Sequence, residues 1–171
     1  GNATVIASRV GTSPAYGAAL LPGGELLVSE WNGNIWLVDS QGGIRRYARL
    51  DANIYQIATD AAGTVYAASY NGNILRWQPK RGVSTLETGF QKGRLVAIAA
   101  SPDGLVYAAE RGEGGRILRF DRDGTRGLLF HTPNALFYGL SVDQEFLYAL
   151  DLRERRLLRL PVDKLSLLAD R

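Results

Sequence analysis

Acidic side chains recur at one position of an internal repeat of about 40 residues. That position holds Glu30, Ser69, Glu110 and Asp151 in four successive copies. Carboxylates that converge from several copies could hold a hard divalent cation, which binds several oxygen ligands. A carboxylate can also accept the backbone N–H groups of the turn that follows it, which is a local structural role. We predict the structural role, and the alternative is a metal site at Glu30, Glu110 and Asp151.

Tyrosines recur at a second position of the repeat, where Tyr16, Tyr55 and Tyr138 precede runs of small residues and Val96 takes the place in the third copy. If these runs surround one axis, the three phenol rings face one mouth of a central channel. Aromatic faces stack on sugars or other rings, and the hydroxyl groups offer hydrogen bonds. The alternative is that each tyrosine wedges between neighbouring copies. These three tyrosines are the predicted ligand-binding surface.

His131 is the only histidine and therefore the natural candidate for a general base. It follows the apolar run at 128–130 and precedes Thr132-Pro133-Asn134, which predicts a connection between two copies. No serine or aspartate can be placed beside it from the sequence. We therefore predict a surface residue and assign no catalytic residue.

Arginines recur on a third apolar run of the repeat, at Arg76, Arg119 and Arg159. Long arginine side chains can cover apolar surface and keep their charge in water, which is the reading we favour. The alternative is an interaction surface that also includes Trp31, Tyr70 and Trp77, since arginine and tryptophan are common in interface hot spots.

The elements that must position these residues are short strands joined by tight turns. The sequences WNGNIWLVD at 31–39 and YNGNILRWQ at 70–78 share Asn-Gly-Asn-Ile. Asn-Gly between two β-prone runs predicts a hairpin with a two-residue turn, because both residues tolerate positive φ. The recurrence of this hairpin predicts a repeat architecture.

Four runs make up each copy. The second runs lie at 25–28, 64–67, 105–108 and 146–149, and the third runs at 35–38, 74–77, 117–120 and 157–160. A more polar fourth run follows, and the first run is rich in glycine and alanine, as an inner strand needs where sheets converge. This pattern predicts an all-β chain of four four-stranded β-propeller blades. We expect one domain over 1–171, with blades near 14–50, 54–90, 94–131 and 136–171 and an extra strand at 4–10.

The stretches SPDGLVYAAE…GGRILRFDRDG at 101–124 and YGLSVDQEFLYALD at 138–151 resemble the NHL-repeat propellers and the gluconolactonase- and strictosidine-synthase-like superfamily. This resemblance implies the fold, but sensor modules, scaffolds, lactonases and lyases share such blades. For the lactonase-like enzymes it also implies a divalent metal at the channel mouth, held by a glutamate and by asparagine and aspartate residues of inner strands. The starts of the inner strands here carry no asparagine or aspartate. We therefore predict a non-enzymatic binding or sensor module for a protein or small ligand; the alternative is a metal-dependent lactonase, esterase or lyase.

The composition of the chain excludes several kinds of site and function. The 171 residues include no cysteine, which excludes disulfides and thiolate metal sites. The 20 Lys and Arg residues are scattered among 17 acids, so no basic stripe predicts nucleic-acid binding. No apolar run is long enough for a membrane helix, and no cofactor is predicted. The chain begins Gly-Asn-Ala without methionine, so we expect a processed or trimmed chain, and an extracytoplasmic location (periplasmic or secreted) is compatible with this composition.

Ring closure is the last expectation. Propellers have about 4 to 8 blades, and a closed ring usually pairs one terminal strand into the other terminal blade. Two segments compete for that edge, at 4–10 and 165–170. The four blades therefore form either a four-bladed ring or, as we favour, an arc completed by a second copy or by further sequence. An open arc exposes apolar faces on its end blades, which predicts a homodimer through those blades.

Overall fold

The chain forms fifteen strands in a computed structural model that describes residues 3–112 and 114–162, and no helix occurs among them. The first blade contains β1 (Ala15–Leu20), β2 (Leu26–Glu30), β3 (Asn34–Val38) and β4 (Ile44–Arg49), and the second contains β5 (Ile54–Thr59), β6 (Val65–Ser69), β7 (Ile74–Gln78) and β8 (Gly82–Glu87). The third contains β9 (Leu95–Ala100), β10 (Val106–Glu110), β11 (Gly115–Phe120) and β12 (Arg126–Thr132), and the fourth contains β13 (Phe137–Val142), β14 (Phe146–Asp151) and β15 (Arg156–Pro161). The described chain therefore lacks any helix that could cross a membrane.

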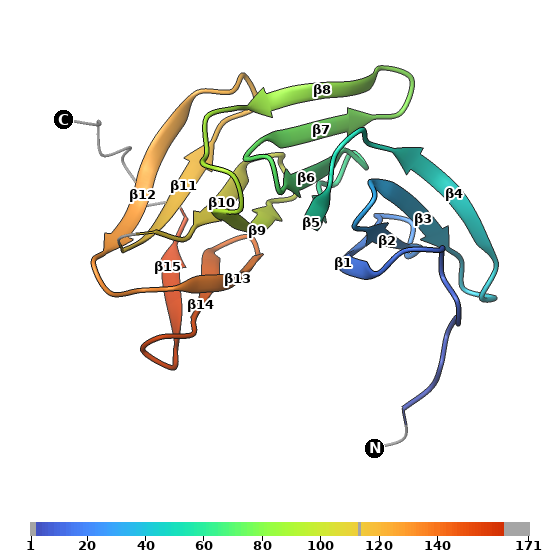
Figure 1. The fold of residues 1–171 in the computed structure, drawn as a ribbon, viewed down its shortest axis with the longest axis horizontal. Helices are drawn as coiled ribbons and strands as arrows, with labels where there is room; N and C mark the ends of the chain where they lie inside the picture. The colour runs from blue at the N-terminus through green and yellow to red at the C-terminus, as the bar shows by residue number, and fades with distance from the viewer. Residues whose placement is uncertain (1–2, 113, 163–171) are drawn as a thin grey trace.

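Each blade is an antiparallel meander in which consecutive strands pair. Figure 1 shows the four sheets following one another around a curved arc, with β1, β5, β9 and β13 on its inner side and β4, β8 and β12 outside. This confirms the predicted all-β propeller of four blades. The fourth sheet has three described strands, and the outer strand expected at 165–170 lies outside the described residues. The extra strand expected at 4–10 is absent: this segment forms no strand, and Figure 1 shows it extending away from the first blade.

The Asn-Gly hairpins differ from the predicted two-residue turn. The loop between β2 and β3 spans 31–33, and the Gly33 N–H donates to the Glu30 carbonyl at 3.0 Å. Only the glycine has positive φ, at 87° for Gly33 and 84° for Gly72, so Asn32 and Asn71 adopt ordinary backbone conformations. A three-residue hairpin loop that ends on a left-handed glycine is a common alternative to the two-residue turn.

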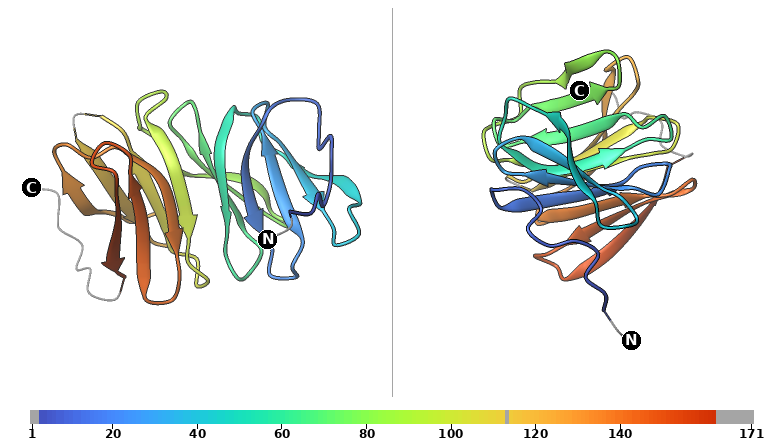
Figure 2. Two further views of the ribbon diagram at one scale, coloured as in Figure 1. Left: turned by 90° about the horizontal axis from the view of Figure 1, so that it is seen from below. Right: turned by 90° about the vertical axis from the view of Figure 1, so that its right-hand side faces the viewer.

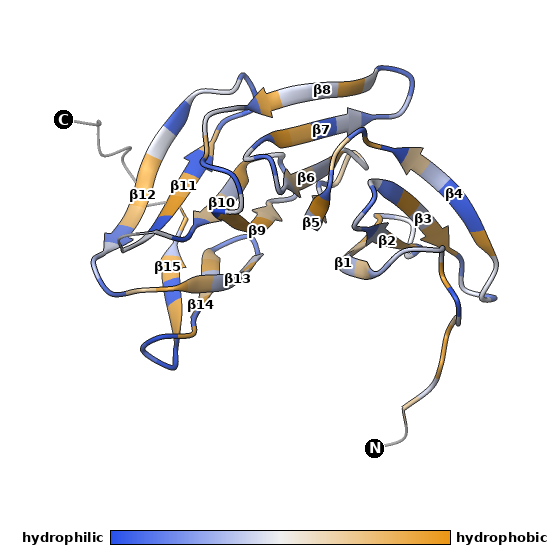
Figure 3. Cartoon of the chain, in the orientation of Figure 1, coloured by the Kyte–Doolittle hydropathy of each residue, from blue (hydrophilic) through white to orange (hydrophobic). Residues whose placement is uncertain are grey.

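Three apolar cores lie between consecutive blades and hold the arc together. Leu27, Ile35 and Ile54 belong to the core between the first and second blades, and Phe120 belongs to the next one. The inner strands approach closely: a methyl group on Gly17 would lie 3.0 Å from the Ile57 backbone nitrogen of the second blade. The small residues of the inner strands therefore permit the blades to converge, as predicted. Figure 2 shows the blades side by side, and Figure 3 shows apolar colour along the inner strands and more polar stretches on the outer ones.

Packing between inner strands runs from β1 to β5, from β5 to β9 and from β9 to β13. Among the described residues no comparable packing joins β13 back to β1, and Figure 1 shows the first and fourth blades at the two ends of the arc. Large apolar side chains are exposed on both end blades, including Leu20 at 60% and Leu157 at 67%.

Candidate aromatic mouth

Five aromatic side chains gather where the inner strands begin. Tyr16, Tyr55 and Tyr138 stand near the starts of β1, β5 and β13, while Trp31 and Tyr70 directly follow β2 and β6. Antiparallel pairing brings the end of each second strand beside the start of the first strand of the same blade. All five residues therefore lie on one face of the arc, and we call them the aromatic mouth.

Four rings of the aromatic mouth contact one another across the first two blades. The Trp31 ring centroid lies 5.3 Å from that of Tyr16 and 5.4 Å from those of Tyr55 and Tyr70. Tyr55 also lies 6.1 Å from Tyr16 and 5.8 Å from Tyr70, with edge-on geometry. Such tilted and edge-to-face pairs are the arrangements that aromatic rings prefer. The predicted tyrosines thus contact neighbouring blades, and at the same time Tyr16 and Tyr138 remain 54% and 43% exposed.

Basic side chains flank the mouth on the side of the third blade, where Val96 replaces the tyrosine. The Lys92 ammonium lies 5.0 Å from the centroid of the Tyr70 ring, within the range of a cation–π contact. Arg111 donates from Nη1 to the Tyr138 hydroxyl at 3.1 Å. Burial raises the pKa of Tyr55 against the opposing charge of Arg111, so its phenol is neutral at physiological pH. The mouth therefore combines neutral aromatic faces with positive charge.

Two aromatic members of the mouth were missed in sequence reasoning. The sequence places Trp31 and Tyr70 only in the alternative interaction surface with the recurring arginines, whereas in the structure they lie with Tyr16 and Tyr55. The signal that could have found them is an aromatic residue before Asn-Gly in two copies, because that turn lies beside the start of the inner strand.

Glu30 binds the segment that leads into β1 of the first blade. Its carboxylate accepts the backbone N–H groups of Thr12 and Ser13 and, at 2.8 Å, the side-chain amide of Asn34. Burial alone would raise the pKa of Glu30. The N–H groups around it, first that of the adjacent Trp36 indole and then those of Ser13, Asn34 and Thr12, outweigh burial and lower the pKa to about 2.

The other recurring acids also act within their own blades. Arg116 donates from Nε to Glu110 at 3.0 Å. Asp151 accepts the Leu136 N–H at 3.0 Å and the Arg156 side chain at 3.2 Å, and these donors outweigh burial and lower its pKa. In the described part of the chain, no three His, Asp or Glu side chains gather as metal ligands would. The recurring acids therefore hold in place the turns that follow them and the segments that lead into the inner strands.

His131 was expected in a connection, but it belongs to β12 and pairs with Arg116 of β11 in the sheet register. The polar run at 131–132 extends the outer strand, because pairing with β11 outweighs the turn signal of the proline that follows. His131 is exposed and borders a pocket of about 420 Å³ with Arg94, Glu110 and Arg116. Glu110 in this pocket is already bound by Arg116. The residues that line the pocket include no serine or aspartate that could act with the histidine.

Comparisons with known proteins concern the fold. No family model matches the chain, and no curated protein does. A streptogramin B lyase structure is similar with a TM-score of 0.64 and 15% identity over 90% of this chain and 56% of the lyase chain. A putative gluconolactonase is similar with a TM-score of 0.67 and 15% identity over 88% of this chain and 60% of that one.

The computationally designed Ika4 protein is similar with a TM-score of 0.64 and 14% identity, over 94% of this chain and 99% of the designed chain. The chain thus spans less than two thirds of the lyase and gluconolactonase chains but nearly all of the designed one. The likeness to gluconolactonase-like and lyase propellers confirms the resemblance seen in the sequence. At these identities it concerns the fold and leaves activity undetermined.

Proposed function

We propose that this propeller is a non-enzymatic binding module whose aromatic mouth takes an acidic sugar. The observation that carries the proposal is the continuous set of rings from Tyr16 through Trp31 and Tyr55 to Tyr70. Aromatic faces stack on the apolar faces of sugar rings, and phenol hydroxyls bind sugar hydroxyls. Lys92 and Arg111 supply positive charge beside these rings, which favours a carboxylate on the sugar.

The mouth is shared by two copies of the chain in this proposal. Tyr138 stands at the fourth blade and Tyr16 at the first, at opposite ends of the arc. Two arcs of four blades, each placing its fourth blade against the first blade of the other, complete a ring within the known range of about 4 to 8 blades. Each contact then brings the Tyr138 and Arg111 of one copy beside the Tyr16 of the other. The exposed Leu20, Leu150 and Leu157 supply apolar area for the contact.

Binding of trigalacturonate, compared with its fully methyl-esterified form, tests the acidic-sugar proposal by calorimetry. We expect the acid to bind and the neutral ester to bind more weakly, since the ester lacks the charge that Lys92 and Arg111 recognise. Tyr16→Ala should weaken binding about fivefold to tenfold by removing one stacking face. Tyr47→Ala is the matched control, because Tyr47 packs against Trp77 at 4.7 Å, away from the mouth, and it should leave the affinity unchanged.

Equal affinity for the acid and its ester, or no binding of either, would contradict the acidic-sugar proposal. The enzymatic alternative is tested separately with glucono-δ-lactone. Hydrolysis that requires an added divalent cation and stops with a chelator would favour a metal-dependent lactonase over a binding module.

A further inference from the structure

A buried tyrosine hydroxyl without a partner marks a second pocket, on the face opposite the aromatic mouth. Tyr107 is fully buried in β10, and its hydroxyl has no hydrogen-bond partner among the described residues. Buried hydroxyl groups are almost always paired, so an unpaired one calls for a physical explanation. Burial raises the pKa of Tyr107, so the group is a neutral phenol at physiological pH.

The same tyrosine is paired in the neighbouring blades. Tyr66 donates to Asp60 and Tyr148 donates to Asp143, each at 3.1 Å. In the third blade the position of Asp60 is occupied by Ser101. The Ser101 hydroxyl donates to the Asp103 carboxylate and accepts the Leu105 N–H at 3.0 Å, so it is engaged within its own turn. The change from aspartate to serine is what leaves the Tyr107 hydroxyl unpaired.

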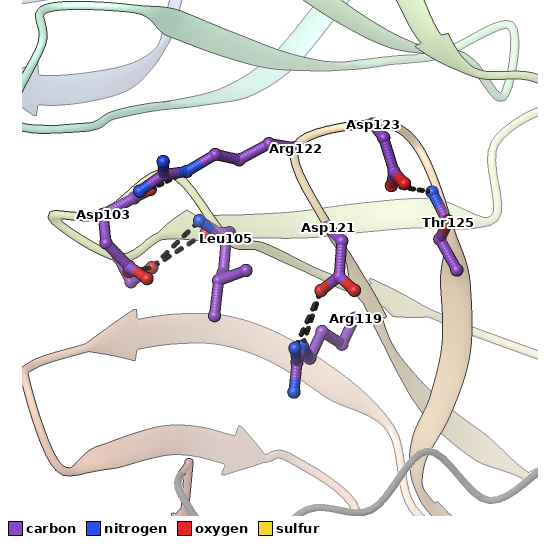
Figure 4. A network of polar contacts seen from close by, with 8 residues as sticks. Asp103, Leu105, Arg119, Asp121, Arg122, Asp123 and Thr125 are labelled. Carbon is purple, nitrogen blue, oxygen red and sulfur yellow. Dashed lines mark hydrogen bonds and ion pairs between the residues drawn. The ribbon is translucent and has the colours of Figure 1, made fainter.

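The junction between the second and third blades has a pocket of about 410 Å³ at the equivalent place, and its lining includes Arg76 and Arg122. Arg122 donates to the Asp103 carbonyl, and Arg76 reaches across from the second blade to the Arg122 carbonyl at 3.2 Å. Figure 4 shows Arg122 extended to Asp103, while Arg119 turns to Asp121 in its own blade. At the next junction Arg119 therefore does not cross, and Val162 occupies the repeat position of Arg122.

The corresponding pocket between the third and fourth blades has a volume of about 420 Å³. This volume falls within the range of about 300 to 1,000 Å³ typical of small-molecule sites. Pro102, Leu105 and Val162 supply apolar walls, and Asp103 and Asp143 supply carboxylates. Backbone N–H groups of Glu145 and Phe146 lower the pKa of Asp143, so this carboxylate is ionised. The residues that line the pocket include no lysine or arginine.

We propose that the pocket between the third and fourth blades binds a compact apolar amine. The protonated nitrogen donates to the Tyr107 oxygen and to the Asp103 carboxylate, and the apolar body lies against Pro102, Leu105 and Val162. A cation suits a pocket with two acids and no basic lining residue, and a rigid apolar body loses little conformational entropy on binding. This site is separate from the aromatic mouth and does not depend on the acidic-sugar proposal.

Calorimetry with three ligands that share one cage tests this proposal: 1-adamantylamine, 1-adamantanol and 1-adamantanecarboxylate. We expect the amine to bind most tightly, the alcohol to bind more weakly and the carboxylate not to bind. Tyr107→Phe keeps the ring and should weaken amine binding about tenfold. Val162→Arg places in this pocket the arginine found at the neighbouring junction, and its positive charge should repel the ammonium and abolish binding. Tyr66→Phe, at the neighbouring junction, is the matched control and should leave the affinity unchanged.

Thermal melting of each variant shows whether it folds, and Tyr107→Phe keeps the test decisive if Val162→Arg does not fold. No binding of the amine, binding of the carboxylate as tightly as the amine, or full amine affinity in Tyr107→Phe would each overturn the proposal.

Discussion

The middle blades and the end blades of this arc share one repeat but differ in what covers them. In the third blade, Leu95, Ala97 and Ile98 of β9 are at most 2% exposed, because cores lie on both faces of the strand. In the first blade, Leu20 of β1 is 60% exposed, and in the fourth blade Leu157 of β15 is 67% exposed. A middle blade is therefore stabilised by neighbours on both of its faces, whereas an end blade of the arc has a neighbour on one face only.

The largest effect is expected at the hairpin of the second blade. A Cβ atom on Gly72 would lie 2.0 Å from the Phe90 carbonyl oxygen, and the residue has a φ of 84°. Gly72→Val should therefore lower the free energy of unfolding by more than about 4 kcal/mol. Gly63→Val is the matched control: its φ is 75°, but no atom lies within 4 Å of its Cβ position. It should cost only the backbone strain of about 1–2 kcal/mol. Equal losses in urea unfolding would show that the contact with Phe90 is unimportant.

Truncation of a middle core compared with an end face gives the next largest effect. Phe120 is fully buried between the second and third blades, and Phe120→Ala should cost about 3–5 kcal/mol. Leu157→Ala removes an exposed side chain and should change the stability of a dilute sample by less than about 0.5 kcal/mol. At high protein concentration the same variant should melt below the parent, because the proposed contact with a second copy would lose apolar area. A Leu157→Ala cost that is large and independent of concentration would contradict the comparison.

Acid should weaken the first blade through Glu30. Its folded-state pKa of about 2 lies below the ordinary value of 4.5, so the stabilisation is complete above about pH 5 and is lost as the pH falls towards 2. The second blade has Ser69 at this position, and its hydroxyl accepts the Asn73 N–H at 3.1 Å without titrating in this range. Glu30→Gln should destabilise the protein at pH 7 and flatten the loss of melting temperature between pH 5 and pH 2. Parallel pH profiles of parent and variant would rule out this role.

The smallest effect is expected at the turn of the fourth blade. Arg155 has a φ of 53°, and it occupies the position of Gly33 and Gly72 in the repeat. Arg155→Gly should stabilise the protein by about 1 kcal/mol, because glycine adopts positive φ without steric cost. Arg153→Gly, in the same turn but without positive φ, should be neutral or slightly destabilising. A lower melting temperature for Arg155→Gly would show that the arginine makes contacts that outweigh its backbone strain.

The fold was predictable because its signals are local. Repeated Asn-Gly turns and small residues on the first run specify hairpins and a converging inner edge, and both are present. The predicted type of turn was wrong, because the sequence does not show that glycine alone would take the left-handed conformation. His131 was misplaced because pairing with β11 extends the outer strand beyond the apolar run.

The candidate sites were predictable only in part, because they depend on which ends of different strands meet. Tyr16, Tyr55 and Tyr138 were identified from their shared position in the repeat. Trp31 and Tyr70 were not, since they reach the mouth from another strand. The unpaired hydroxyl of Tyr107 was missed altogether: it arises where serine stands at Ser101 instead of the aspartate found at Asp60, which matters only once the tyrosine hydroxyl is placed beside that position.

The central claim is that the end blades of one copy pack against those of a second copy and complete the aromatic mouth. Light scattering coupled to size-exclusion chromatography at micromolar concentration tests it directly. We expect twice the chain mass for the parent and for Val83→Lys, which changes an exposed residue on the outer strand of a middle blade. Leu20→Lys, on an end face, should give the mass of one chain while keeping a cooperative melt. A parent protein with the mass of one chain at every concentration would contradict the claim.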